Sequence, residues 1–357
     1  MPPFKVEGRN QTMQINQDEA TFGILYPYVI DENVTDIRWN GRCLWIEDLK
    51  KGRYKTEDVL DENFLKVFTS KIAAMANVNF NMSESSLQAA TNELRIHAVH
   101  PSRTGDNTYI IAIRKTPAIA RITDENIEKQ KYADKLTKNL LEALVRSHCS
   151  CVVIGDTGAG KTELLKYMAS FLPENEACLT IEDTLELRLT EIYPEKDISA
   201  IKIDEDYPAE QAIRDALRLL VKYMWIAESR GREIARIVEG VSTGCTAAVT
   251  IHADNVWEVP DRVVQMGGKD EDGASFEDDV YRYFDAGIKV SKEITEHGIH
   301  RRIDQIAFYE RIKQENRTIV FMKNGTYTGE AIPDSILEKF ETNQKNALLD
   351  LMEEIRQ

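Results

Sequence analysis

Apolar and polar positions in the first third of the chain alternate with the period of two that is typical of strands. The alternating stretches are separated by turn residues, among them Asn40-Gly41, a dipeptide typical of hairpins. One longer stretch, residues 59–76, repeats with helical spacing instead. We therefore predict a small α/β domain over residues 1–117 and a charged linker at 118–134. The predicted strands cover residues 35–39, 43–47, 93–99 and 108–114.

Beyond residue 134 the pattern changes to unbroken apolar runs that alternate with amphipathic helices. Unbroken runs are typical of strands buried on both faces of a parallel sheet. They cover residues 151–154, 177–181, 223–227 and 247–251. The predicted helices cover residues 134–148, 163–171, 208–220 and 234–241. This alternation predicts an α/β domain over residues 135–357, ending in a helix at 334–356.

Composition limits what these domains can do. With a net charge of −15 the chain lacks the excess of Lys and Arg that duplex DNA requires, so we expect no direct binding of duplex DNA. Five cysteines occur without a Cys-x-x-Cys pair, which indicates neither a disulfide framework nor a zinc site. No apolar run approaches the roughly 18 residues of a membrane span. We therefore expect a cytoplasmic protein.

The strongest motif follows the first unbroken apolar run. Its glycines, followed by Lys and Thr, are typical of a loop whose backbone N–H groups bind phosphates at a helix N-terminus. Lys161 would reach the β- and γ-phosphates of a nucleotide, and the Thr162 hydroxyl would bind Mg²⁺. The alternative is a glycine-rich turn that binds no nucleotide. The motif consists of Gly155, Asp156, Thr157, Gly158, Ala159, Gly160, Lys161 and Thr162.

Ionisable residues follow the other apolar runs, at the strand ends where open α/β sheets bind ligands. Glu182 and Asp183 are candidates for binding Mg²⁺ or ordering a water, or they could cap the following turn. Glu228 lies where a carboxylate could accept a proton from an attacking water. His252 could hydrogen-bond a γ-phosphate, or it could be a structural histidine.

Three arginines and two His-x-x-His pairs have less decisive patterns. The arginines lie on or beside predicted strands of the first domain and could neutralise charge on a triphosphate, or they could be solvated side chains on a sheet face. The histidine pairs have no third ligand at motif spacing, so metal binding is not indicated. The arginines are Arg95, Arg103 and Arg114, and the pairs are His97 with His100 and His297 with His300.

Four segments occur in the order and spacing of the secretion ATPases, the superfamily that powers type II and type IV secretion and pilus assembly. The chain closely resembles the branch of conjugative and type IV secretion traffic ATPases and tight-adherence pilus ATPases. The resemblance covers roughly residues 30 to 325. The segments are the phosphate loop, Thr180-Ile181-Glu182-Asp183-Thr184 with Glu186-Leu187, Ala227-Glu228-Ser229-Arg230-Gly231, and Thr243-Gly244 through Thr250-Ile251-His252-Ala253.

The resemblance implies a PAS-like N-terminal domain joined to a RecA-like P-loop ATPase domain, assembled as a homohexamer. ATP would sit between the two domains, and its hydrolysis would move one against the other. By position, Lys161, Glu182, Glu228 and His252 would be catalytic, and Thr162, Glu182 and Asp183 would hold Mg²⁺. The phosphate loop with Glu163, and Arg95 and Arg114 of the N-terminal domain, would bind the nucleotide. The partners would be inner-membrane components of a secretion or pilus machine, with the ATPase at the inner face of the cell membrane.

Two positions depart from the family pattern. Ala227 stands where Gly usually precedes the catalytic Glu, and Cys245 stands where His usually follows Thr-Gly. These departures keep open a rival function, a scaffold that binds ATP and assembles but hydrolyses it negligibly. A P-loop kinase is a third possibility, although no Arg-rich lid segment follows the motor motifs.

Overall fold

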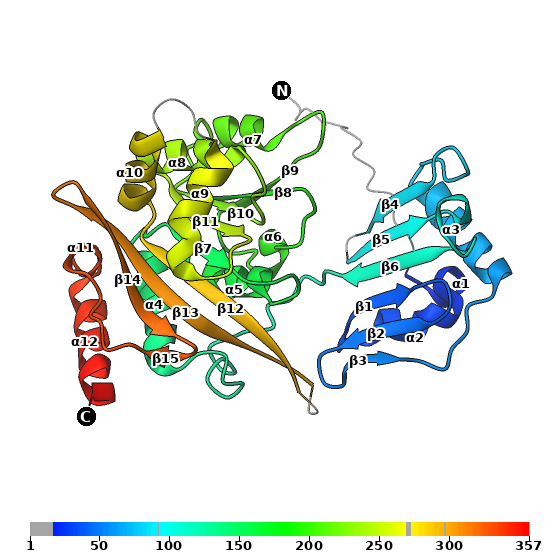
Figure 1. Cartoon of the computed structure of the whole chain (residues 1–357), viewed down its shortest axis with the longest axis horizontal. Coiled ribbons are helices and arrows are strands. Elements are labelled where there is room, and N and C mark those ends of the chain that lie inside the picture. The colour runs from blue at the N-terminus through cyan, green and yellow to red at the C-terminus, as the bar shows by residue number, and fades with distance from the viewer. Residues whose placement is uncertain (1–16, 92, 269–272, 296–297, 357) are drawn as a thin grey trace, which may run out of the picture. The chain divides into compact units, whose positions relative to one another are not determined.

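The computed structural model describes residues 17–91, 93–268, 273–295 and 298–356 (Figure 1). The chain divides into two compact units. Unit 1 contains the chain up to Pro117 together with Ile294–Ile299, and unit 2 contains Ala118–Glu293 and His300–Gln357. The chain therefore passes between the units at three points, after Pro117, after Glu293 and after Ile299.

Unit 1 is a six-stranded antiparallel sheet in the order β3-β2-β1-β6-β5-β4. Its strands are β1 (Val34–Trp39), β2 (Leu44–Asp48), β3 (Gly52–Lys55), β4 (Ser86–Ala90), β5 (Leu94–Val99) and β6 (Ile110–Lys115). Its helices are α1 (Glu19–Phe22), η1 (Gly23–Leu25), α2 (Tyr26–Ile30), α3 (Glu62–Met75) and η2 (Pro101–Arg103). Helices α1, α2 and α3 cover one face of the sheet (Figure 1), where their apolar side chains form one core with the strands.

Strand alternation separates the two faces of this sheet. Ile96 of β5 and Ile113 of β6 are buried against the helices. Arg95 and Arg114 are directly opposite each other on the same two strands and face away from that core. The predicted strands of the first domain are confirmed to within two residues at each end, whereas β3 and β4 were not predicted.

Unit 2 is built on a nine-stranded sheet in the order β15-β14-β13-β12-β7-β11-β10-β8-β9. The six strands from β12 to β9 are parallel, and β13, β14 and β15 pair antiparallel. The parallel strands are β7 (Cys151–Ile154), β8 (Cys178–Glu182), β9 (Ile198–Lys202), β10 (Tyr223–Ile226), β11 (Thr246–Ile251) and β12 (Ala286–Thr295). The others are β13 (Gly298–Ile312), β14 (Glu315–Lys323) and β15 (Thr326–Tyr327).

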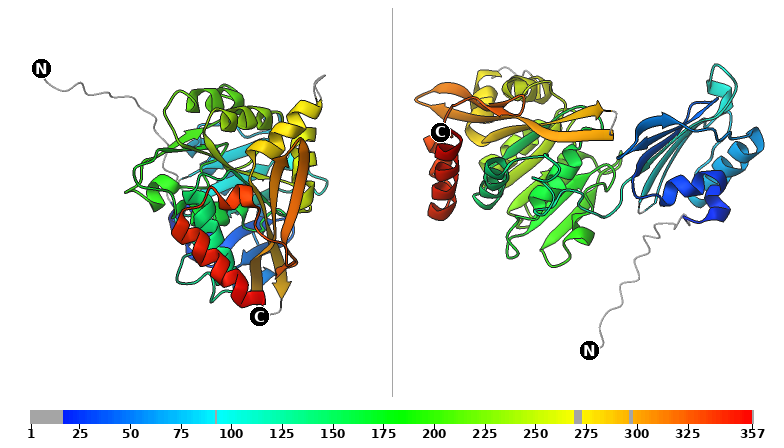
Figure 2. Two further views of the ribbon diagram at one scale, coloured as in Figure 1. Left: turned by 90° about the vertical axis from the view of Figure 1, so that its left-hand side faces the viewer. Right: turned by 90° about the horizontal axis from the view of Figure 1, so that it is seen from below.

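Both faces of this sheet are buried by helices, which explains the unbroken apolar runs. In β7, Cys151 and Val153 join one core, and Val152 and Ile154 join the other. Figure 2 shows α12 alongside α4 within the first of these layers. The first core packs on α4 (Lys135–Arg146), α5 (Lys161–Ala169), α6 (Leu189–Ile192), α11 (Asp334–Leu337) and α12 (Thr342–Arg356). The second packs on α7 (Ala209–Ala216), α8 (Glu233–Ser242), η3 (Val256–Glu258), α9 (Val259–Gly267) and α10 (Gly273–Tyr283).

The segment predicted as a linker, residues 118–134, packs on unit 2. Its Ile127 and Tyr132 are buried in the first core of that unit. The helix predicted at 208–220 ends at Ala216, and the one predicted at 334–356 is divided into α11 and α12. Among the described residues, none of the helices combines the length and the apolar character needed to cross a membrane.

Candidate functional site

The carboxyl ends of four parallel strands meet at one edge of the unit 2 sheet. Ile154 of β7 is paired with Ile251 of β11, and Ile226 of β10 is paired with Val249 of β11 and Ile181 of β8. Because these strands end in register, the segments that follow them emerge side by side. The phosphate loop, Glu228 and His252 belong to those segments, and Glu182 is the last residue of β8.

The loop after β7 has the backbone that its glycines allow. Gly155, Gly158 and Gly160 have φ angles of +146°, +75° and +103°, a range that residues with a Cβ rarely adopt. A Cβ on Gly155 would lie 2.3 Å from the carbonyl oxygen of Val290 in β12. Helix α5 begins directly after Gly160, so its first N–H groups face the loop. This backbone fits an anion such as a phosphate group.

Lys161 lies against the same loop. Its Nζ donates to the carbonyl oxygen of Gly155 at 2.7 Å and to that of Asp156 at 3.4 Å. Burial lowers the pKa of the ammonium, an effect that the charges of Glu228 and Asp156 partly oppose. A half-buried cation at the N-terminus of a helix suits a bound polyphosphate, which would replace carbonyl oxygens as its hydrogen-bond partner.

Two basic residues from β12 and β13 also lie at this loop, and no sequence pattern pointed to them. Arg301 Nε donates to the carbonyl oxygen of Gly158 at 3.2 Å, and its Cδ would lie 3.1 Å from a Cβ on Gly160. Lys292 Nζ would lie 3.6 Å from a Cβ on Gly158. These residues are more than 130 positions from the loop, so their proximity depends on the sheet and leaves no local signal.

Glu228 follows β10 by two residues and lies against two basic side chains. Its Oε1 lies 2.9 Å from His252 Nε2, and its Oε2 accepts a hydrogen bond of 2.6 Å from Arg230. Burial by itself would raise the pKa of this carboxyl. The hydrogen bond and charge of Arg230, with the charges of His252 and Lys161, outweigh burial and hold the pKa below its ordinary value. The carboxylate is therefore ionised at neutral pH.

The turn after Glu228 is organised by Glu233, a residue that the sequence analysis missed. Its Oε1 accepts hydrogen bonds from Ser229 Oγ at 2.9 Å, Arg230 N at 2.7 Å and Gly231 N at 2.9 Å. Ser229 N also donates to the carbonyl oxygen of Thr250 in β11. The only local signal was an acidic residue at the start of a predicted helix, which is a common helix-capping pattern.

Glu182 and Asp183 differ in their surroundings. Glu182 is only 2% exposed, and its carboxylate accepts hydrogen bonds from Thr180 Oγ1 and from the backbone N–H groups of Glu186 and Leu187. Burial raises the pKa of Glu182 to about 7. Asp183 is about half exposed and lies 3.7 Å from the Arg230 guanidinium. Asp183 is thus the more accessible of the two carboxylates.

The remaining predicted residues belong to other elements of the described structure. Arg95 and Arg114 belong to unit 1, where Arg114 Nε donates to Asp36 at 2.9 Å, and Arg103 is exposed in η2. His300 Nε2 lies 3.2 Å from the carbonyl oxygen of Gln130, while His297 lies outside the described residues. Within the described part of the chain, no group of three or more His, Cys, Asp or Glu side chains is placed to hold a metal ion.

The two departures from the family pattern occupy different ends of the sheet. Ala227 directly precedes Glu228, and its carbonyl oxygen accepts a hydrogen bond from Thr250 Oγ1. Cys245 is buried just before β11 begins, with its Sγ 3.6 Å from the carbonyl oxygen of Lys222. His252 follows the other end of this six-residue strand, roughly 20 Å away at about 3.3 Å per residue. Cys245 therefore cannot touch a phosphate bound at the loop.

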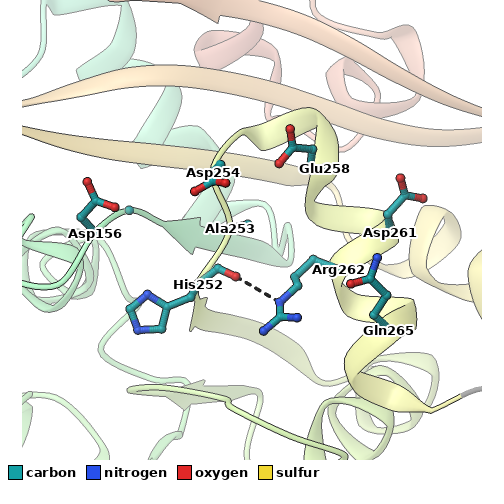
Figure 3. A pocket seen from close by; sticks show the side chains of 9 residues that line it. Asp156, His252, Ala253, Asp254, Glu258, Asp261, Arg262 and Gln265 are labelled. Carbon is teal, nitrogen blue, oxygen red and sulfur yellow. Dashed lines mark hydrogen bonds between the residues drawn. The ribbon is translucent and has the colours of Figure 1, made fainter.

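A cavity of about 450 Å³ adjoins the phosphate loop on the side of α9. Figure 3 shows Arg262 of α9 reaching the main-chain oxygen of His252, to which its Nε donates at 3.2 Å, while the imidazole points away from α9. Four carboxylates in the lining would repel an anion, so the cavity suits phosphate less well than the loop itself. The lining residues are Gly155, Asp156, His252, Ala253, Asp254, Glu258, Asp261, Arg262 and Gln265.

Comparison with known proteins agrees with this site. The model of the type II/IV secretion system protein family matches residues 66–294, a stretch that includes the phosphate loop, Glu182, Glu228 and His252. The chain belongs to this family. As a type II/IV secretion system protein, it falls within the secretion ATPase superfamily that its four motifs predicted, so that prediction is confirmed.

Individual relatives place the match in context. The chain is 26% identical over 309 residues to an uncharacterized protein of Bacillus anthracis, covering 83% of this chain and 69% of that protein. It is 28% identical over 187 residues to the type IV secretion system protein VirB11 of Brucella suis, covering 44% and 50%. The X-ray structure of the ATPase DotB of Yersinia pseudotuberculosis matches with a TM-score of 0.61 at 15% identity, over 99% of this chain and 90% of that one. The shared fold confirms the predicted α/β class.

Proposed function

We propose that this secretion system protein hydrolyses ATP and that its turnover drives a type IV secretion, conjugation or pilus-assembly machine. One observation carries the proposal: the glycine loop, Lys161, Glu228 and His252 lie together at the carboxyl edge of the parallel sheet. A phosphate-binding backbone and an ionised carboxylate are the two components that water attack on a triphosphate requires.

Each residue of the site has a role in the proposed reaction. The N–H groups of the loop and of the first turn of α5, including Glu163, bind the phosphates, and Lys161 neutralises their charge. Glu228 orients the attacking water and accepts its proton. The His252 imidazole lies 2.9 Å from the Glu228 carboxylate in the free protein, and we propose that it contacts the γ-phosphate when ATP is bound.

Glu228 must exchange partners before it can act as a base. Its pKa lies below the ordinary value because Arg230 pairs with it, and a weaker base takes a proton less readily. We propose that Arg230 leaves Glu228 when nucleotide binds. The second carboxylate near Arg230, that of Asp183 at 3.7 Å, provides an alternative partner.

The oxygen donors near the loop suit Mg²⁺, which prefers hydroxyl and carboxylate ligands. Thr162 would hold the ion together with Asp183, and Glu182 would support them. Bound Mg²⁺ would neutralise charge on the β- and γ-phosphates. Because both oxygens of Glu182 already accept hydrogen bonds, Asp183 is the better candidate for direct contact.

We also propose the larger assembly. The domains are an N-terminal PAS-like domain over residues 1–117 and a RecA-like ATPase domain over 135–357, and six chains form a ring at the inner face of the cell membrane. Arg95 and Arg114 bind the nucleotide, and hydrolysis is coupled to movement of one domain against the other. Support comes from the secretion system proteins that the chain resembles and from the outward position of both arginines on their sheet.

The rival function is a scaffold that binds ATP and assembles without appreciable hydrolysis. The contact that favours it is the pairing of Arg230 with Glu228, which would persist in a scaffold. Ala227 and Cys245 were the two positions that favoured the scaffold, and Cys245 lies too far from the phosphate loop to do so.

The experiment combines phosphate release with solution mass, for the wild type and Lys161→Ala, with and without MgATP. We expect the wild type to release phosphate and to form a species near 244 kDa, the mass of six 40.7 kDa chains. Lys161→Ala should lose at least about 99% of the rate, because the ammonium acts directly on the phosphates. A wild type that binds ATP but releases no phosphate would favour the scaffold, and a monomer at every concentration would exclude the ring.

A further inference from the structure

The segment that leads from unit 1 into unit 2 is fastened to the helix that begins at the phosphate loop. Unit 2 starts at Ala118, and residues 119–124, here called the entry segment, contact side chains of α5. Helix α5 starts with Lys161 and Thr162. The residues on α5 that contact the entry segment are Glu163, Lys166 and Tyr167.

One carboxylate is at the centre of these contacts. Glu163 Oε2 accepts a hydrogen bond from the backbone N–H of Arg121 at 3.1 Å, and its Oε1 accepts one from Lys166 Nζ at 3.1 Å. The same Nζ lies 3.4 Å from the carbonyl oxygen of Ile119, to which it donates. Glu163 and Lys166 thus hold an N–H and a carbonyl of the entry segment, contacts that do not depend on its side chains.

A further contact lies one turn along the helix. Tyr167 Oη donates to Asp124 Oδ1 at 2.7 Å, and Asp124 also lies 3.4 Å from Lys138 of α4. Between these contacts Ile122 is buried in the first core of unit 2, at 5% exposure. The entry segment is therefore held at both ends and in the middle.

Burial makes the ion pair of Lys166 with Glu163 costly to break. The Lys166 side chain is only 2% exposed, and an ammonium taken out of water is costly unless a carboxylate and further acceptors surround it. The carbonyl oxygen of Ile119 is one of those acceptors. Displacing the entry segment would leave both that acceptor and the Arg121 N–H to find new partners, so segment and helix are expected to move as one body.

The position of Glu163 connects this anchor to the nucleotide. It directly follows Thr162, so its Cα moves with the first turn of α5. A loop that closes on phosphates shifts this turn, and the shift reaches Arg121 through one side chain. Glu163 and Arg121 are 42 residues apart in the sequence, so this contact is made by the fold and not by local spacing.

We infer that Glu163 and Lys166 are positioning residues. They tie the entry segment to the phosphate-loop helix and so transmit nucleotide binding to the segment that connects unit 2 with unit 1. The inference rests on the proposed nucleotide site. It adds the route by which nucleotide binding at that site is transmitted out of unit 2. Glu163 therefore has a second task besides offering its backbone N–H to phosphate.

The test is hydrogen exchange of the full chain, without nucleotide and with MgADP or a non-hydrolysable MgATP analogue. The test variant is Glu163→Leu with Lys166→Met, since replacing both members of a buried ion pair by apolar residues of similar size often preserves folding. The matched control is Glu142→Ala, which breaks the exposed pair of Glu142 with Arg146 in α4. Peptides over 118–124 report the anchor, and peptides over 155–162 report nucleotide binding.

Without nucleotide, we expect the double variant to exchange about tenfold faster than the wild type over 118–124, as loss of hydrogen bonds to charged groups implies. The control should match the wild type. With nucleotide, the wild type should slow its exchange over both 155–162 and 118–124, whereas the double variant should slow it over 155–162 only. That separation would support the anchor as the route.

Two results would overturn the inference. The first is equal exchange over 118–124 in the double variant and the wild type. The second is a nucleotide response over 118–124 that persists in the double variant. If neither the wild type nor the variants show nucleotide-dependent protection over 155–162, the proposed nucleotide function fails, and the proposed transmission fails with it. The comparison without nucleotide still decides whether Glu163 and Lys166 anchor the entry segment. Should the double variant not fold, Tyr167→Phe replaces it, with an expected threefold faster exchange; unchanged exchange would then reject the anchor.

Discussion

Glu182 shows how burial sets the behaviour of one residue. Its carboxyl is 2% exposed, and burial raises its pKa to about 7 from an ordinary value of 4.5. Below about pH 4.5 the group is neutral in both the folded and the unfolded chain. Between about pH 4.5 and about pH 7 it is neutral when folded and ionised when unfolded. Rising pH therefore favours unfolding across this window.

The prediction is that Glu182→Gln removes this pH dependence. Without nucleotide, the free energy of unfolding of the wild type should fall from pH 4.5 to pH 7 relative to that of the variant. The difference between the two free energies of unfolding should then stay constant above pH 7. Denaturant unfolding at several pH values measures the difference, with Glu142→Gln, an exposed carboxylate, as the control. Parallel pH curves for the wild type and Glu182→Gln would show that Glu182 titrates normally.

At the scale of elements, the contact between β7 and β12 fixes the phosphate loop. Gly155 has a φ of +146°, and a Cβ there would lie 2.3 Å from the carbonyl oxygen of Val290. At Gly155 the loop therefore approaches β12 too closely for any side chain. A substitution here should disturb the spacing of the sheet as well as the backbone of the loop.

Gly155→Ala should accordingly lower the free energy of unfolding by about 2–4 kcal/mol and abolish nucleotide binding. Gly244→Ala is the matched control, because Gly244 also has a positive φ, +100°, but no atom lies within 4 Å of its added Cβ. The control should cost about 1–2 kcal/mol from backbone strain alone. Equal losses in the two variants, measured by denaturant unfolding, would argue against a role for the contact with Val290.

Elements were predictable where one local pattern decides them. The apolar runs of β7, β10 and β11 require burial on both faces, and in the structure both faces of these strands are buried. Strand β12 was missed because Gly287 and Lys289 interrupt its apolar positions, and its place beside β7 depends on the whole sheet. The helix predicted to Leu220 stops at Ala216, after which the N–H groups of Arg218 and Leu219 bond three residues back. Leu220 itself has a φ of +58°, which no right-handed helix allows.

The site divides in the same way. Lys161 was found through the glycine-rich motif. Glu182, Glu228 and His252 were found because each lies at or close to the end of an apolar strand, a position that sequence alone identifies. Arg230, Glu233 and Arg301 were not, because their importance comes from contacts with Glu228, with the turn after it and with Gly158. Such contacts follow from the packing of distant segments and leave no periodic trace in the chain.

In the whole molecule, the proposed chemical site is connected to the part of the chain that leads to unit 1. Unit 2 supplies the phosphate loop, the carboxylate and the anchored entry segment, and the chain passes from it to unit 1 at three points. A motor needs both hydrolysis and a physical route from the site to the moving part. The anchor of α5 on the entry segment provides that route, whereas hydrolysis depends on Glu228.

Steady-state phosphate release by the wild type and Glu228→Gln, at saturating MgATP, tests the central claim most directly. Glutamine keeps the size of the side chain and one acceptor oxygen but cannot accept the proton. We expect the rate to be at least about 100-fold lower in the variant, the usual contribution of a general base, with ATP affinity retained. Glu258→Gln, which changes a carboxylate in the adjoining cavity, should leave the rate unchanged. Equal rates in the wild type and Glu228→Gln would contradict the claim that this site hydrolyses ATP through Glu228.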